Sequence, residues 1–270
     1  FTSSGTEANN LAVKGVAESQ REHGTHLILS NIEHPSIDQS VAWLEQQGFT
    51  ATRVPVDREG RLSVGAVTEA ITEQTILIAT HHANHDLGTV QNLPALGALA
   101  GERGIPLLID ATASGGWLPV DVTAHSISLL TLAPQRFGGP QGVGVLYRNP
   151  RVPLAPQLHG GVQQGGLRAG TENLAAIVGA GAASALPAIE VTPLQQHLHG
   201  GLLERIEQMT LNGPEPGPDR LPTQLNYSLA GLEGEGLALA LDMQGVAIAS
   251  GAACVTQTLA IPPALAAIGL

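Results

Sequence analysis

The chain has 270 residues, of which 43% are hydrophobic and 13% are charged, a composition that supports a large core and argues against intrinsic disorder. Its 12 basic and 23 acidic side chains give a formal net charge of −11, which argues against non-specific nucleic-acid binding. The single cysteine, Cys254, excludes an internal disulfide and a multi-cysteine metal site, and no apolar run reaches the roughly 20 residues of a membrane span.

Short apolar runs alternate with helical patterns over the first two-thirds of the chain. Strands are predicted at 25–30, 50–56, 75–81, 105–110, 128–133 and 143–148. Helices are predicted at 36–48, 63–71, 92–104 and 172–189, the first of them ending at Gly48. Such alternation predicts an α/β fold with a largely parallel sheet.

The pattern changes after Pro193. A helix is predicted at 194–209, then a turn-rich loop at 212–222, and finally a strand, a helix and a strand at 223–230, 235–244 and 246–254. We therefore place a domain boundary near residue 190.

Four polar side chains closely follow predicted strands of the sheet, namely His34, His85, Asp110 and Arg136. Ligands of parallel α/β sheets bind at the carboxyl ends of the strands, so these four are candidate site residues. Asp110 ends a buried strand, and a buried carboxylate needs a partner. A cationic ring nitrogen, a metal ion or loop N–H groups would each serve.

Two segments are candidate anion sites. Gly5 and Thr6 begin a helix, where free backbone N–H groups and the helix dipole favour an anion. The alternative there is an ordinary N-cap with Glu7 in the first turn. The Gly-rich segment 159–173 adds the guanidinium of Arg168 before another helix.

Three further features carry side chains with their own chemistry. Residues 81–86 contain three histidines and an aspartate, but their spacing matches no metal motif, and on a strand His81 and His82 point to opposite faces. Cys254 lies among small residues, which fits either a buried inert thiol or an exposed nucleophile. Lys14 is the only lysine, so any mechanism that needs a lysine amine uses Lys14 or another chain.

Six segments resemble, in order, the motifs of pyridoxal-phosphate-dependent cysteine desulfurases of the class V aminotransferase family. They are FTSSGTEANNLAVKG (1–15), EHPSI (33–37), ANHDLGTVQ (83–91), DATAS (110–114), HGGVQQGGLRAGTEN (159–173) and SGAACVTQT (250–258). The resemblance covers nearly the whole chain. It implies the fold type I of these enzymes, with a cofactor-binding large domain at 1–190 and a reduced small domain at 191–270.

The resemblance also implies roles for individual residues. Gly5 and Thr6 would contact the phosphate of the cofactor, and Thr171 would reach the phosphate in the site of a partner subunit. Cys254 would attack the substrate sulfur and hold it as a persulfide, in a reaction that converts L-cysteine to L-alanine.

Three residues would face the ring of the cofactor. His34 would lie over the pyridine ring and Asp110 would pair with its nitrogen. His85 stands at the position of an Asn that contacts the ring hydroxyl.

The sequence departs from the family at the positions that carry the chemistry. Arg136 stands where the family has its Schiff-base lysine, Gln135 where it has the preceding His, and Ala266 where it has the Arg that holds the substrate carboxylate. Ala133 and Ala113 likewise replace a Ser and a Gln. A guanidinium stays protonated near neutrality and forms no imine, so Arg136 cannot replace the lysine.

We therefore expect a catalytically impaired desulfurase-like protein, a pseudoenzyme that binds pyridoxal 5′-phosphate without a covalent bond if it binds it at all. The alternatives are a non-enzymatic partner subunit of an active paralogue and a binder of a phosphorylated ligand with different chemistry. The resemblance implies a homodimer or a heterodimer with a paralogue, a sulfur acceptor or iron–sulfur scaffold as partner, and a cytoplasmic location without nucleic acid or membrane. The chain begins at the phosphate segment and stops before the C-terminal helix of the family, so we expect a fragment or a trimmed product.

Overall fold

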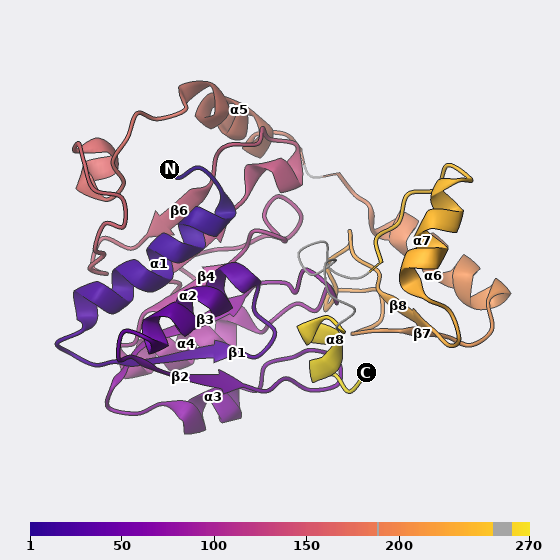
Figure 1. Ribbon diagram of the computed structural model, residues 1–270, viewed down its shortest axis with the longest axis horizontal. Helices are drawn as coiled ribbons and strands as arrows, with labels where there is room; N and C mark the ends of the chain where they lie inside the picture. The colour runs from indigo at the N-terminus through magenta and orange to yellow at the C-terminus, as the bar shows by residue number, and fades with distance from the viewer. Residues whose placement is uncertain (188, 251–260) are drawn as a thin grey trace.

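A six-stranded sheet lies at the centre of the larger part of the molecule (Figure 1). The structure is a computed structural model that describes residues 1–187, 189–250 and 261–270. The strands are β1 (His26–Ser30), β2 (Thr50–Val54), β3 (Thr75–His81), β4 (Leu107–Asp110), β5 (Leu129–Leu132) and β6 (Val145–Arg148). Their order is β2-β1-β3-β4-β5-β6, and only β6 is antiparallel to its neighbour.

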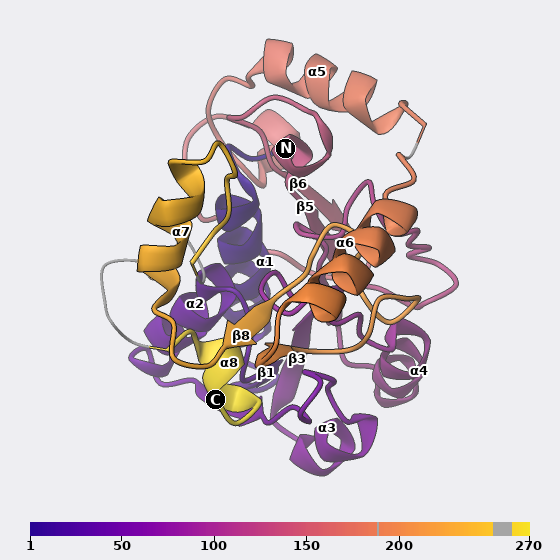
Figure 2. The same cartoon turned by 90° about the vertical axis from the view of Figure 1, so that its right-hand side faces the viewer.

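Helices cover both faces of this sheet (Figure 2). On one face, α1 (Gly5–Gln20) and α2 (Pro35–Glu45) pack in a cluster that includes Leu27 and Leu29 of β1. On the other face, α3 (Val64–Ala70) and α4 (Leu93–Arg103) pack in a cluster that includes Ile28. Side chains of a strand alternate between its faces, and both faces here are apolar, so the central strands β1, β3 and β4 are buried throughout.

The remaining elements follow the sheet in the chain. They are the helices α5 (Leu174–Ser184), α6 (Thr192–Arg205), α7 (Gly234–Asp242) and α8 (Pro263–Ala267), the strands β7 (Met209–Leu211) and β8 (Tyr227–Leu229), and the 3₁₀ turns η1 (Pro134–Phe137) and η2 (Gln163–Gly166). β7 and β8 pair as a separate antiparallel sheet beside α6 and α7 (Figure 1). None of the helices among the described residues is long and apolar enough to cross a membrane.

The short C-terminal helix α8 returns to the large sheet. Its Ala264 packs with Ile32, which follows β1, and with Leu87, which follows β3. This places α8 next to the loops at the carboxyl ends of the parallel strands.

The predicted α/β fold and mainly parallel sheet are confirmed, and each of the six predicted strands contains one strand of the sheet. Two predictions in the second part are wrong. Residues 246–250 do not form a strand, and the rest of that predicted strand lies outside the described residues. The helix predicted at 194–209 is α6, which starts at Thr192 and already ends at Arg205, and Met209 begins the strand β7 (Met209–Leu211) instead, which pairs with β8.

The predicted end of one helix differs from the structure. α2 stops at Glu45, and Gly48 instead takes a left-handed conformation (φ 88°) in the turn that follows. The domain boundary near residue 190 stays a prediction.

Candidate active site

A polar pocket opens where the parallel strands of the large sheet end. It is lined by the start of α1, by His34 after β1, by His85 after β3, by Asp110 at the end of β4, and by Gln135 and Arg136 after β5. The structure therefore brings together residues from distant parts of the chain that the sequence placed at strand ends.

The start of α1 presents polar groups to this pocket. The hydroxyl of Ser4 caps the helix by accepting the backbone N–H of Glu7 (3.1 Å). The N–H groups of Gly5 and Thr6 belong to the first turn and have no acceptor within the helix. A Cβ on Gly5 would lie 2.8 Å from Cγ2 of Thr112, so the helix start packs directly against the loop after Asp110.

Asn9 connects this helix to two candidate cofactor residues. Its amide nitrogen donates to Oδ2 of Asp110 (2.8 Å) and to the hydroxyl of Ser36 (2.9 Å), and its oxygen accepts from the hydroxyl of Thr131 (2.6 Å). A carboxylate at neutral pH can only accept, which fixes the orientation of the amide. Oδ1 of Asp110 accepts the backbone N–H of Thr112 (2.9 Å), so both oxygens of this buried carboxylate are held in place.

His34 is fixed by the helix that it caps. Its Nδ1 accepts the backbone N–H of Ser36 (3.1 Å) and lies 2.7 Å from the hydroxyl of the same residue. A backbone N–H can only donate, so Nδ1 carries a lone pair and the proton of the neutral ring is on Nε2. The ring meets that of His85 edge to face, with centroids 5.2 Å apart.

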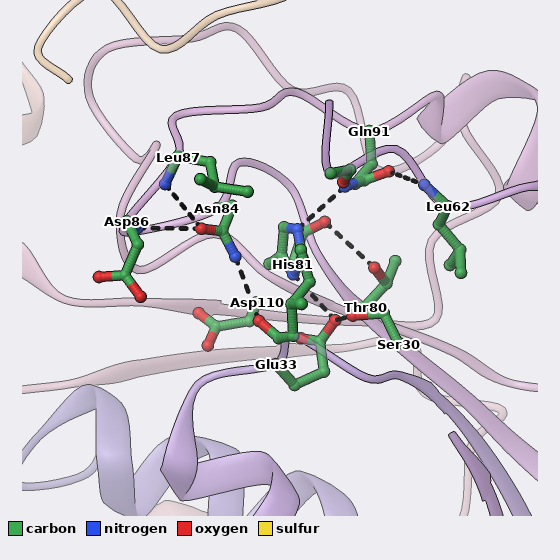
Figure 3. A network of polar contacts seen from close by, with 12 residues as sticks. Ser30, Glu33, Leu62, Thr80, His81, Asn84, Asp86, Leu87, Gln91 and Asp110 are labelled. Carbon is green, nitrogen blue, oxygen red and sulfur yellow. Dashed lines mark hydrogen bonds and ion pairs between the residues drawn. The ribbon is translucent and has the colours of Figure 1, made fainter. Parts of the chain in front are cut away.

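His85 lies in a loop held by a neighbouring amide. The oxygen of Asn84 accepts the backbone N–H groups of Asp86 (3.0 Å) and Leu87 (2.9 Å), as Figure 3 shows. Burial lowers the pKa of His85, although the carboxylate of Asp86, 3.6 Å from Nε2, opposes this effect. His85 is therefore a neutral imidazole at pH 7.

A buried chain of hydrogen bonds lies behind the pocket (Figure 3). Oε1 of Glu33 accepts from Nδ1 of His81 (2.9 Å) and from the hydroxyl of Ser30, and Nε2 of His81 lies 3.0 Å from the amide nitrogen of Gln91. The oxygen of Gln91 accepts the backbone N–H of Leu62 (2.9 Å), so its nitrogen must face His81. Both ring nitrogens of His81 are therefore engaged by protein groups.

The histidine-rich segment does not gather as a metal site. Within the described ranges, no group of three His, Cys, Asp or Glu side chains is placed to hold a metal ion. His82 points away from His81 and meets the hydroxyl of Ser114 (3.0 Å), as expected for neighbours on a strand.

Arg136 lies in η1, one turn after Ala133, whose backbone oxygen accepts the N–H of Arg136 (2.9 Å). Its exposed side chain lines the pocket. Lys14 does not line the pocket, and its Nζ lies 4.8 Å from the centre of the ring of Trp43, near the C-terminal end of α2.

Thr171 and Arg168 belong to a different cavity beside the start of the chain. The guanidinium of Arg168 is paired with Glu7 through two contacts of 2.7 and 3.1 Å, and this pairing, together with Ser3, lowers the pKa of Glu7 to about 2 against the effect of burial. Because Glu7 occupies it, Arg168 does not provide the second anion site that we expected of this loop. Cys254 lies outside the described residues.

Comparison with known proteins gives the family. The model of the family described as "Aminotransferase class-V" matches residues 1–267. The chain belongs to this family. Cysteine desulfurase IscS of Clostridium botulinum is 41% identical over 278 residues, which cover 100% of this chain and 70% of the relative. Cysteine desulfurase IscS of Methanosarcina thermophila is 40% identical and is covered over 68% of its length.

Solved structures of this family have the same fold. A structure described as SspA in complex with cysteine superposes with a TM-score of 0.87 at 34% identity and is covered over 76% of its length. A NifS-like protein superposes with a TM-score of 0.89 at 28% identity and is covered over 72%. The predicted family is thus confirmed, and the members of the family depend on pyridoxal phosphate.

The pocket keeps several residues that fit this cofactor, although it offers no amine for a covalent bond. The hydroxyls of Thr6 and Thr112 line the pocket without a hydrogen-bond partner in the described part of the chain, and they stand beside the unpaired N–H groups of α1, a donor set suited to a phosphate. Asp110 offers a fixed carboxylate to a ring nitrogen. No lysine amine lines the pocket among these residues.

Sequence reasoning identified the residues at the strand ends but missed those that hold them. Asn9, Ser36 and Thr131 orient Asp110 and His34. Asn9 and Ser36 lie within the motif segments but received no role of their own, and Thr131 lies inside β5. The available signal was the spacing of Asn9 from Gly5, which puts both on the same side of α1.

Proposed function

We propose that this protein is a cysteine desulfurase-like protein that binds pyridoxal phosphate without a covalent bond and is impaired in catalysis. The full reaction would transfer sulfur from L-cysteine to the thiol of Cys254, which breaks the carbon–sulfur bond, forms a persulfide and releases L-alanine. The observation that carries the proposal is that Arg136 lines a pocket in which Gly5, Thr6, His34 and Asp110, residues of the cofactor-binding type, also lie.

Each of these residues would have its own role in binding the cofactor. The N–H groups of Gly5 and Thr6 would bind the phosphate, Asp110 would hold the ring nitrogen in its protonated form, and His34 would cover one face of the ring. When bound, the cofactor supplies an electron sink. The side chain of Gln135 does not titrate near neutral pH, so it cannot act as a general acid or base. We therefore expect proton transfer to be the most impaired step of the reaction.

The neutral His85 supports binding rather than rapid turnover. Its imidazole stands where the resemblance places an Asn amide, and it can offer one N–H to a ring oxygen. An Arg cation cannot take up a proton at pH 7, and no other titratable group of the pocket occupies the lysine position.

The test combines binding with chemical fixation. The purified protein is titrated with pyridoxal phosphate, followed by absorbance and by equilibrium dialysis, and then treated with borohydride and mapped by mass spectrometry. We expect reversible binding, no stoichiometric adduct on Lys14 or the terminal amine, and alanine release from L-cysteine far below that of an intact relative. A stoichiometric lysine adduct or rapid alanine release contradicts the proposal.

A dimer is part of the same proposal. The side chains of Leu174 and Val178 on α5 are 69% and 71% exposed, and Thr171 lies just before this helix. Such a surface suits a partner subunit whose phosphate site Thr171 would complete. Sedimentation equilibrium at micromolar concentration is expected to give a dimer, either of this chain alone or of this chain mixed with a lysine-bearing paralogue. A stable monomer both alone and in the mixture contradicts the proposed dimer.

A further inference from the structure

The loop that carries His85 is bonded to a segment far along the chain. We call residues 84–90 the His85 loop and residues 219–224 the supporting segment. Three hydrogen bonds join them: the N–H of Leu221 donates to the oxygen of Gly88 (2.7 Å), the N–H of Val90 to the oxygen of Asp219 (2.9 Å), and Nε2 of Gln224 to the oxygen of Asp86 (2.9 Å). The supporting segment therefore belongs to the surroundings of the pocket, which His85 lines.

The bond from Gln224 acts nearest to His85. It holds the oxygen of Asp86, the next residue in the chain, while the oxygen of Asn84 holds the N–H of Asp86 from inside the loop (3.0 Å). The loop backbone also passes directly against Gln224, since a Cβ on Gly88 would lie 3.1 Å from that of Gln224. Asp86 is thus fixed on one side by its own loop and on the other by Gln224.

The supporting segment is held in turn by α6. Gln195 is the one residue of α6 that is buried, and its Nε2 donates to the backbone oxygens of Leu221 and Gln224 (2.9 Å each). The apolar Leu194 and Leu198 of the same helix are instead exposed. A buried amide is costly unless its hydrogen bonds are made, so the attachment of α6 at this point depends on the two bonds of Gln195.

Arg220 adds further bonds from within the supporting segment. Its buried guanidinium donates to the backbone oxygens of three residues, namely Asn212, Pro214 and Gln224. These bonds, like those of Gln195, fix the path of the backbone. Two hydrogen bonds in series, from Gln195 to Gln224 and from Gln224 to Asp86, connect α6 to the residue next to His85.

We propose that Gln224 and Gln195 are positioning residues of the pocket, which fasten the His85 loop to α6 and so keep His85 in place. Loops open locally at a lower free energy than the core of a sheet, and a group in a site is placed accurately only when its support is rigid. Loss of either amide is expected to loosen the loop without unfolding the sheet. The inference rests on the proposed function in one respect, namely that this pocket is the active site.

Amide hydrogen exchange, followed by NMR on the ligand-free protein, measures the opening of the junction. The N–H groups of Val90 and Leu221 report it, because each donates across the junction. The variants are Gln224→Met and Gln195→Met, since methionine keeps the length of the side chain and removes its donors. Gln196→Met, at the exposed next position of α6, is the matched control.

The pH titration of the His85 ring, followed by NMR on the same samples, shows whether the loop positions this side chain. Burial lowers the pKa of His85, and the titratable groups that act on it are Asp86, His34, His81 and Asp110. A loosened loop admits water to the ring, so the pKa of His85 is expected to rise toward its ordinary value of 6.5. A variant that only lowers the overall stability leaves this pKa unchanged.

We expect the exchange of Val90 and Leu221 to be about tenfold faster in both variants than in the parent protein, the effect of about one lost hydrogen bond. The exchange of Leu108 in the central strand β4 stays unchanged, and Gln196→Met matches the parent in both measurements. Unchanged exchange at Val90 and Leu221, equal acceleration at Leu108, or an unchanged pKa of His85 overturns the inference. Failure of the parent protein to bind pyridoxal phosphate overturns the proposed function alone, because none of these measurements uses the cofactor.

Discussion

The side chain at position 136 decides whether the pocket can form a covalent bond with an aldehyde. We predict that Arg136→Lys captures pyridoxal phosphate in a form that borohydride fixes at position 136, because Gly5, Thr6 and Asp110 remain in place around the new amine. Alanine release from L-cysteine should stay low. Gln135 and Ala266 still lack an acid–base group and a carboxylate clamp, and loss of one positioned acid or base typically costs about 10²–10⁴-fold.

Two comparisons sharpen this prediction. Arg103→Lys adds a lysine at the exposed end of α4 and should not be modified at stoichiometric level. Adding Gln135→His and Ala266→Arg to Arg136→Lys is the smallest set from which we expect measurable alanine release. If Arg136→Lys alone released alanine at the rate of an intact relative, the substitutions at Gln135 and Ala266 would be shown not to limit the reaction.

Asn9 is the residue that holds the polar floor of the pocket together. We predict that Asn9→Ala lowers the free energy of unfolding by about 2–4 kcal/mol, because it leaves the hydroxyl of Thr131 and one oxygen of Asp110 buried without their partner. Urea denaturation followed by circular dichroism measures the change. The neighbouring Asn10→Ala removes an exposed bond to the backbone oxygen of Thr6 (2.9 Å) and should cost less than about 1 kcal/mol. Equal losses in the two variants would refute the role of Asn9.

At the scale of elements, the loops after β1 and β3 are joined by the buried contact between Glu33 and His81. Oε2 of Glu33 has no partner among the described residues, so this carboxylate depends on its other oxygen for stabilisation. The contact fixes the residue that immediately precedes His34, which lines the pocket.

We predict that His81→Leu destabilises the protein by about 3–5 kcal/mol, because it leaves a buried carboxylate without its main donor. Urea denaturation again measures the loss. The double variant His81→Leu, Glu33→Gln should recover part of it, since the amide carries no charge. A loss below about 1 kcal/mol in the single variant would refute the stabilising role of this contact.

The elements of the sheet were predictable because their signals are local and strong. The uninterrupted apolar runs of β1, β3 and β4 are typical of strands buried on both faces. In α4, Asn92 caps the start and Gly104 the end of a segment whose apolar residues recur with the helical period. The short strand β7 was not predictable, because its three residues are stabilised by pairing with β8. Thr210, for example, pairs with Ser228, which follows it by 18 residues in the sequence. Residues 246–250 have a strand-like composition, but they pair with no strand in the part of the chain that the structure describes.

At the scale of the whole molecule, the segment around Arg220 joins the second part of the chain to the loop that carries His85, because Thr89 and Arg220 form a β-bridge. The buried guanidinium of Arg220 donates to backbone oxygens of Asn212 (2.5 Å) and Pro214, and burial lowers its pKa to about 10. The next residue, Leu221, donates its N–H to the oxygen of Gly88 (2.7 Å). This junction depends on contacts between segments far apart in sequence, which explains why residue patterns did not reveal it.

The folded molecule also buries histidines in their neutral form, which makes its stability depend on pH. Burial lowers the pKa of His82 from 6.5 to about 4, with His81 and His125 contributing, and burial likewise lowers the pKa values of His26 and His85. Below pH 6.5 the unfolded chain binds protons at these sites while the folded chain does not, so the free energy of unfolding falls as the pH is lowered. For His82 alone the loss between pH 7 and pH 4 is about 3 kcal/mol.

The paired carboxylate of Glu7 does not contribute to the first part of this loss. Pairing with Arg168 lowers the pKa of Glu7 from 4.5 to about 2, so its stabilising effect is complete above pH 4.5 and disappears only as the pH falls from there toward 2. The buried histidines are therefore expected to contribute to a decline in stability between pH 6.5 and 4.5, and substitution of one of them tests this. We predict that His82→Gln, which keeps a polar group beside Ser114, flattens this decline, whereas His23→Gln, at an exposed position, leaves it unchanged. The measurement is the free energy of unfolding in urea at half-unit steps from pH 7.5 to 4.5. Parallel curves for the parent and His82→Gln would show that His82 is not the group that titrates, and a rise in stability toward pH 4.5 would reverse the sign of the whole argument.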